Sequence, residues 1–144
     1  MIMITAVLDT NVLASGTVTA NTPPGQILNA WRDGQFELIT STYIIDELKH
    51  TFRTPYFQSH LGTGAISNFV DLLINEATIA PIHSNVKGIA THPEDDLAID
   101  TAVTSKADYF VTGDKPLLSK IGNSYQGVSF VTPNEFLKIL QKRV

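Results

Sequence analysis

HPEDDLAIDTAVTSKADYFVTGD, residues 92–114, is the stretch that decides the fold. Its apolar residues recur at helical spacing over 96–105, and the strand formers Tyr109 to Thr112 follow after only three intervening residues. Helix and strand must therefore run antiparallel. Each is about 15 Å long, from the rise per residue of a helix and of a strand. Because the lengths match, we expect Asp96 and Asp114 to return to the same edge of a sheet.

The rest of the chain repeats this alternation of strands and helices. Strands are predicted over 2–8, 36–40 and 128–131, and helices over 23–34, 42–52, 65–76 and from 133 onward. Residues 78–82 predict at most an edge strand because Pro81 cannot donate a ladder hydrogen bond. Residues 14–22 and 56–64 are expected to be irregular, and Leu117-Leu118 begins a connection, containing Gly122 and Gly127, whose structure the pattern does not determine. The pattern predicts an α/β fold, a three-layer α/β/α sandwich with a mostly parallel central sheet, as one domain over 1–144.

Composition narrows the class of protein. The chain has 144 residues, 43% of them hydrophobic, which suits one domain with a sizeable core. It has no cysteine, which excludes disulfides, thiolate nucleophiles and sulfur-bound zinc. No signal peptide and no apolar run of membrane-spanning length is present, so we expect a cytoplasmic protein without a membrane partner. The net charge of -4 does not attract nucleic acid by itself.

Four carboxylates are predicted to gather where the parallel strands end. Asp9 and Asp114 directly follow strands, and Asp96 reaches the same edge with its helix. Glu47 lies at the margin of the apolar face of the helix over 42–52, whereas Asp46 points away from that face. The sequence therefore places Asp9, Glu47, Asp96 and Asp114 around one site.

Such a cluster favours a divalent cation. Two carboxylates about 4 Å apart repel by about 4 kcal/mol at an effective dielectric of 20, so four need protons or cations to neutralise them. Oxygen-only ligands select Mg²⁺ or Mn²⁺ over zinc. These ions can generate hydroxide from water and stabilise both oxygens of a phosphodiester displacement. Bound cations would also draw phosphate to an acidic protein.

At this point the chain resembles a known family, the PIN domains, in the branch of VapC-like toxins of toxin–antitoxin systems. The matching motifs are Asp9-Thr10-Asn11, Ile45-Asp46-Glu47-Leu48, Asp95-Asp96 and Val111-Thr112-Gly113-Asp114. The resemblance implies a Mg²⁺- or Mn²⁺-dependent endoribonuclease whose catalytic and metal-binding quartet is Asp9, Glu47, Asp96 and Asp114. It also implies an RNA substrate, a small antitoxin protein as partner, and a homodimer.

Four further polar residues lie beside this quartet. The resemblance matches Asn11 to a polar neighbour of the first aspartate and Thr112 to a hydroxyl-bearing position before the last. Asp95 is either a fifth ligand or a helix N-cap. Asp100 departs from the small or apolar residue of the family, and is either a supporting residue one turn below Asp96 or a solvated one.

Other functions fit parts of the pattern. Phosphatases that form an aspartyl phosphate also begin with a strand and an aspartate, but they carry a second aspartate where this chain has Asn11. A receiver-like phosphoacceptor domain usually has an acid pair after its first strand, and here there is one acid. A non-catalytic RNA- or protein-binding module is the third alternative. The presence of all four acids argues against it.

Overall fold

Strand β1 (Thr5–Leu8) lies at the centre of the fold, with three buried apolar residues and a parallel neighbour on each side. The computed structural model describes residues 3–83, 86–90 and 95–143. In that part of the chain, one six-stranded sheet has the order β3-β2-β1-β4-β6-β5, and only the β5–β6 pair is antiparallel. The remaining strands are β2 (Glu37–Thr40), β3 (Thr78–Ile79), β4 (Tyr109–Val111), β5 (Ser124–Tyr125) and β6 (Val128–Val131).

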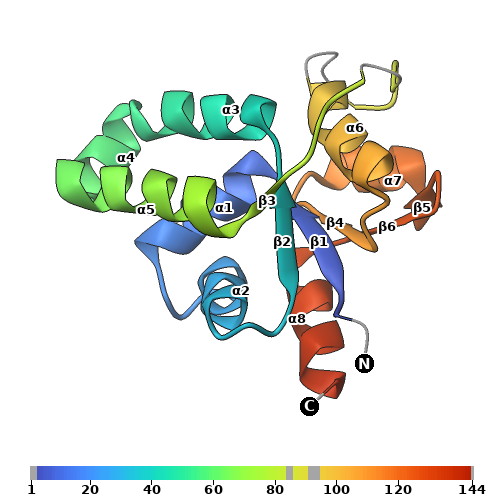
Figure 1. Ribbon diagram of the computed structural model, residues 1–144, viewed down its shortest axis with the longest axis horizontal. Coiled ribbons are helices and arrows are strands. Elements are labelled where there is room, and N and C mark those ends of the chain that lie inside the picture. The colour runs from blue at the N-terminus through green and yellow to red at the C-terminus, as the bar shows by residue number, and fades with distance from the viewer. Residues whose placement is uncertain (1–2, 84–85, 91–94, 144) are drawn as a thin grey trace.

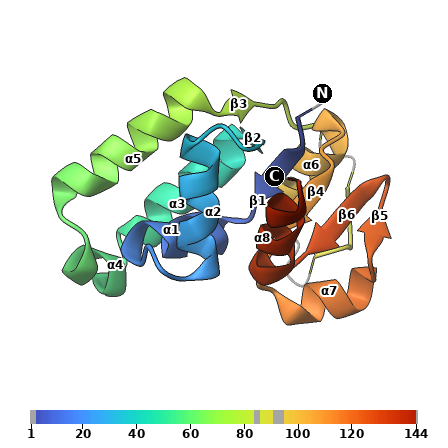
Figure 2. The same cartoon turned by 90° about the horizontal axis from the view of Figure 1, so that it is seen from below.

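Helices cover both faces of this sheet. They are α1 (Thr10–Val18), α2 (Pro23–Arg32), α3 (Thr42–Phe52), α4 (Pro55–His60), α5 (Thr63–Glu76), α6 (Asp96–Ser105), α7 (Lys115–Ile121) and α8 (Pro133–Lys142). Figure 1 shows α1 to α5 on one side of the strands and α6 and α7 on the other. Figure 2 shows α2 beside α8, against which it packs. The predicted three-layer sandwich with a mostly parallel sheet is confirmed.

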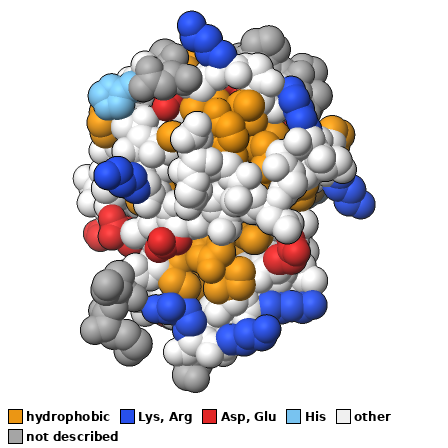
Figure 3. All heavy atoms as spheres, turned by 90° about the vertical axis from the view of Figure 1, so that its right-hand side faces the viewer, with side chains coloured by type: hydrophobic (Ala, Val, Ile, Leu, Met, Phe, Trp, Pro, Cys, Tyr) orange, Lys and Arg blue, Asp and Glu red, His pale blue; other side chains and the backbone are white. Residues whose placement is uncertain are grey.

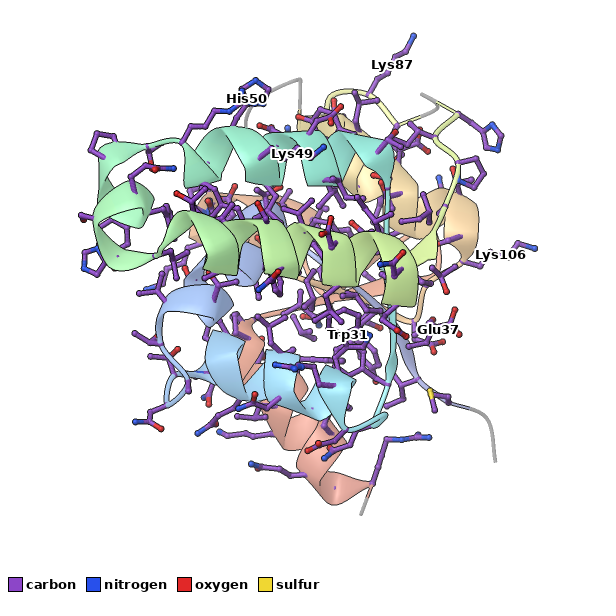
Figure 4. The ribbon with its side chains drawn as sticks, turned by 60° about the vertical axis from the view of Figure 1, so that its left-hand side comes forward. Trp31, Glu37, Lys49, His50, Lys87 and Lys106 are labelled. Carbon is purple, nitrogen blue, oxygen red and sulfur yellow. The ribbon has the colours of Figure 1, made fainter. Side chains whose placement is uncertain are left out.

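Aromatic side chains join the C-terminal helix to the core. Phe136 on α8 meets Phe36 edge to face, with ring centroids 5.1 Å apart, and it also contacts Tyr109 on β4. Trp31 reaches inward from α2 and is only 8% exposed (Figure 4). Among the described helices, none combines the length and apolar composition needed to cross a membrane.

Elements with clear end signals form as the sequence predicts. The Ser41 hydroxyl accepts a hydrogen bond from the Ile44 N–H and caps α3. Thr132 and Glu135 form the reciprocal capping box that opens α8. Helix α6 has the predicted bounds. Residues Thr78 and Ile79 do form an edge strand, which is shorter than the expected segment 78–82 and ends before Pro81.

The expectation of an irregular segment over 14–22 was wrong for its first half, because α1 continues to Val18. The Ser, Gly and Thr residues there have low helix propensity, but the preceding Val12, Leu13 and Ala14 are buried. Packing against α2 decides the outcome. Gly16 lies so close to that helix that an added Cβ would stand 2.8 Å from the Pro24 carbonyl oxygen.

Two other segments, one expected to be irregular and one that the pattern does not determine, also contain regular structure. Helix α4 forms within 56–64 because Pro55 presets its first turn and Phe57 packs edge to face on Phe52, with centroids 5.7 Å apart. After β4, Asp114 caps α7 by accepting the Leu117 N–H, and β5 then pairs with β6. The aspartate followed by proline at Pro116 was a readable helix start.

Candidate active site

A cavity of about 460 Å³ lies at the carboxyl ends of the central strands. Its lining residues are Asp9, Thr10, Asn11, Glu47, Thr51, Asp95, Gly113 and Asp114. Helix α3 carries Glu47, and helix α6 begins directly after Asp95. The two helices lie side by side near this edge (Figure 1). The structure therefore brings together three of the four acids of the predicted quartet, and adds Asp95 in place of Asp96.

Asp9 follows β1 directly and is held from two sides. Its Oδ1 accepts the N–H of Thr10 at 2.9 Å, and its Oδ2 accepts the hydroxyl of Thr112 at 2.8 Å. Desolvation of the inward-turned carboxylate raises the pKa of Asp9, and the charges of Asp114 and Glu47 raise it further. The two hydrogen bonds lower it, but burial outweighs them. The site thus holds a carboxylate whose negative charge the protein does not fully compensate.

Thr112 links Asp9 to the second strand-end aspartate. The Thr112 side chain is 0% exposed, and its hydroxyl accepts the N–H of Asp114 at 3.1 Å while donating to Asp9. Asp114 in turn accepts the Leu117 N–H at 3.1 Å through Oδ1. One buried hydroxyl therefore sets the spacing between the ends of β1 and β4, which agrees with the supporting position expected for Thr112.

Glu47 approaches the cavity from α3. It is half-buried, and its Oε1 accepts the hydroxyl of Tyr43, one turn earlier, at 2.8 Å. Asp46 is exposed, as the helical angle predicted. Thr51 lies one turn after Glu47 on the same side and lines the cavity too, so the spacing of four residues could have identified it.

The two adjacent acids at the start of α6 lie in different surroundings. Asp95 is half-buried and lines the cavity, and its side chain makes no capping hydrogen bond to α6. Asp96 is 5% exposed and is not a lining residue. Its carboxylate accepts three backbone N–H groups, those of Gly88 at 2.8 Å, Ile89 at 3.0 Å and Ala90 at 2.6 Å.

Asp100 is buried rather than solvated. It is 0% exposed and accepts the hydroxyl of Thr104 at 2.9 Å through Oδ1. It is not among the residues that line the cavity, so it supports α6 from within. Asn11, by contrast, faces the cavity from the first turn of α1.

The donor set of the cavity suits a hard divalent cation. Among the described residues, the lining contains four carboxylates and the Asn11 amide, and no lysine, arginine or histidine. His50 points from α3 into solvent (Figure 4). Across the described part of the chain, no three His, Asp or Glu side chains converge closely enough to enclose one ion as they stand. The oxygen ligands and the raised pKa of Asp9 thus fit Mg²⁺ or Mn²⁺ by chemistry, with the carboxylates spread around the cavity wall.

Figure 3 shows the lysines and arginines of the described residues standing apart from one another over the upper part of that face and gathered at its lower end. None of the described residues that line the cavity is a lysine or an arginine. A phosphate group bound against these acids would therefore rely on bound cations.

Comparison with known proteins agrees with this geometry. The profile of a family described as PIN domain matches residues 5–116, which include β1, the cavity acids and the start of α7. An uncharacterised protein of Methanocaldococcus jannaschii, MJ1680, is 29% identical over 150 aligned positions, which cover 98% of this chain and 94% of that protein.

Proposed function

The chain belongs to the PIN domain family, and from this premise we propose that it is an endoribonuclease that uses Mg²⁺ or Mn²⁺ to hydrolyse RNA phosphodiester bonds. PIN domains are generally nucleases that use divalent metals. The observation that carries the proposal is the cavity at the carboxyl edge, which is lined by Asp9, Glu47, Asp95 and Asp114 and has no cationic side chain among its described lining residues.

Asp95 rather than Asp96 belongs in the proposed quartet. For its carboxylate to turn toward the cavity, Asp96 would have to give up three backbone N–H groups, and the N–H of the buried Ala90 would lose its acceptor at a high cost. Asp95, the N-cap residue of α6, already lines the cavity, and its side chain makes no capping hydrogen bond to the helix. The predicted ligand role of Asp96 therefore passes to its neighbour in this proposal.

The protein's own groups would share the work at the cavity. When bound, the divalent ion supplies an activated water and stabilises charge on the phosphate oxygens. Asp9 and Asp114 would hold it, with Thr112 fixing their spacing. Glu47, oriented by Tyr43, would position the attacking water and accept its proton. Asn11 would orient a neighbouring polar group from the first turn of α1.

The biological setting that we propose rests on the resemblance to toxins of toxin–antitoxin pairs. In that setting the enzyme acts in the cytoplasm, dimerises, and is restrained by a small antitoxin protein. The acidic, open cavity supports an inhibitor that approaches with basic groups.

The test compares adjacent residues on one helix. Purified wild type, Glu47→Gln and the control Asp46→Asn are incubated with structured RNAs in Mn²⁺ and in EDTA. We expect the wild type and the control to cleave equally in Mn²⁺, and Glu47→Gln to lose about 100-fold or more of the rate, as for a general base. Asp46 is exposed and does not line the cavity, so its change removes the same charge without touching the site.

Two outcomes would overturn the proposal. One is cleavage that survives EDTA or is equal in wild type and Glu47→Gln. The other is rapid labelling of Asp9 by a small phosphodonor, which would favour the aspartyl-phosphate alternatives.

A further inference from the structure

The segment 86–90, which leads toward α6, is hydrogen-bonded to side chains of two helices. Val86 and Ala90 are buried at its ends, and Gly88 between them has a left-handed φ of 72°. From the start of α6, the Asp96 carboxylate accepts the N–H groups of residues 88 to 90. From α7, the Lys120 ammonium donates to the Gly88 carbonyl oxygen at 2.7 Å.

These contacts connect two carboxylates of the cavity that stand on different helices. Asp95 directly precedes Asp96, and Asp114 is the N-cap of the helix that carries Lys120. The path therefore runs from Asp95 through Asp96, Gly88 and Lys120 to Asp114. Figure 1 shows α6 and α7 together on the same side of the sheet, with the 86–90 segment near the start of α6.

Asp95 and Asp114 are the N-caps of α6 and α7, and they repel each other when both are charged. A tie between the two helices resists their separation. Three charge-assisted hydrogen bonds at the buried Asp96 make the α6 end of the tie strong, because bonds to ionised acceptors exceed neutral ones. The Lys120 end is exposed and weaker.

We propose that Asp96, Gly88 and Lys120 form a brace that sets the spacing between Asp95 and Asp114 for cation binding. Asp96 and Lys120 are then positioning residues, which contact neither substrate nor metal. The inference rests on the proposed function, since it assigns the brace to that same site.

The test uses Lys120→Met, because a lysine cannot be mistaken for a metal ligand. Lys138→Met is the matched control, since Lys138 is exposed on α8 and its loss changes the net charge equally. Mn²⁺ affinity of the full chain is measured by calorimetry without RNA, and amide hydrogen exchange is measured at residues 88–90. Urea unfolding reports whether the variants remain folded.

The sign of the change separates a brace from a charge effect. Removing a cation from an acidic protein should by itself tighten Mn²⁺ binding, in both variants. The brace predicts instead that Lys120→Met weakens Mn²⁺ binding about 10-fold, the lower range for residues that orient ligands. It also predicts faster exchange at residues 88–90, and Lys120→Arg should restore part of both effects. Lys138→Met should do neither.

Asp96→Asn extends the test to the stronger end. The amide group of asparagine cannot accept all three N–H bonds, so this variant should bind Mn²⁺ more weakly than Lys120→Met does. Asp95→Asn, which changes a proposed ligand, should bind Mn²⁺ most weakly of the three. Unchanged affinity and exchange in folded Lys120→Met would overturn the brace. If the wild type binds no Mn²⁺, the proposed function fails, and unchanged exchange at residues 88–90 in Lys120→Met would then overturn the brace separately.

Discussion

Thr112 is the residue through which two of the cavity acids depend on each other. Its buried hydroxyl donates to Asp9 and accepts from the Asp114 backbone. Thr112→Val keeps the shape but removes both bonds, so we expect a loss of about 1 to 3 kcal/mol in the free energy of unfolding, as for bonds to a charged group. Thr112→Ser keeps the hydroxyl and should recover most of it. Urea unfolding measures both, and equal losses would show that the methyl group matters as much as the hydroxyl.

The neighbours Asp95 and Asp96 show where inference from sequence stops. Glu47 could be separated from Asp46 because the apolar face of α3 fixes the rotation of that helix. At the start of α6, which of the two acids lines the cavity depends on the segment 86–90, because its N–H groups donate to the Asp96 carboxylate. That segment has no periodicity from which its path could be derived. The cavity was therefore predictable to its edge and to the start of α6, but the sequence could not tell which of the two adjacent acids lines it.

At the scale of elements, α2 packs closely against the residues that directly follow α1. A Cβ at Gly25 would collide with the backbone carbonyl oxygen of Thr19 and stand 2.8 Å from the Cα of Ala20. Gly25→Ala should therefore lower the free energy of unfolding by about 3 kcal/mol or more, in the range of severe overpacking. Gly64→Ala on α5 is the control, because nothing lies within 4 Å of its Cβ.

That control should gain up to about 1 kcal/mol from helix propensity. Thermal unfolding of the two variants compares them directly, and a harmless Gly25→Ala would show that the two helices can separate. The same contact explains why α1 escaped prediction. Its residues after Ala14 favour loops by themselves, and only the packing against α2 keeps them helical.

At the scale of the whole molecule, the layered architecture was the most predictable property. Alternating apolar strands and amphipathic helices leave few ways to cover a parallel sheet, and the right-handed crossover rule removes most of those. The short elements escaped because a helix such as α4 (Pro55–His60) or a two-residue strand such as β5 carries too few residues for a period to appear.

The pH dependence of stability also belongs to the whole molecule. Because burial raises the pKa of Asp9, the native state holds that proton more tightly than the unfolded chain does. Ionisation of the buried Asp9 therefore lowers the free energy of unfolding. This loss of stability is absent below the unfolded pKa of about 4, grows as pH rises through the raised native pKa, and then stays constant. In EDTA at pH 7, Asp9→Asn should therefore be more stable than the wild type, and the two should converge toward pH 4.

Urea unfolding between pH 4 and pH 8 measures that difference, and exposed Asp46→Asn serves as the control. Millimolar Mn²⁺ should reverse the order, because an ion bound only by the native wild type stabilises it. A less stable Asp9→Asn at pH 7 in EDTA would contradict the account.

The position of β6 and α8 at the end of the sequence affects when the cavity can form during translation. These elements are translated after every acid of the cavity, yet β6 is the outer neighbour of β4, and the Thr112 N–H bonds to the Val131 carbonyl at 3.0 Å. Phe136 of α8, 0% exposed, covers Phe36. A nascent chain that has not reached residue 128 therefore lacks one support of the strand that presents Asp114. For the endoribonuclease that we propose, the cavity would therefore be fully supported only once β6 and α8 have been made.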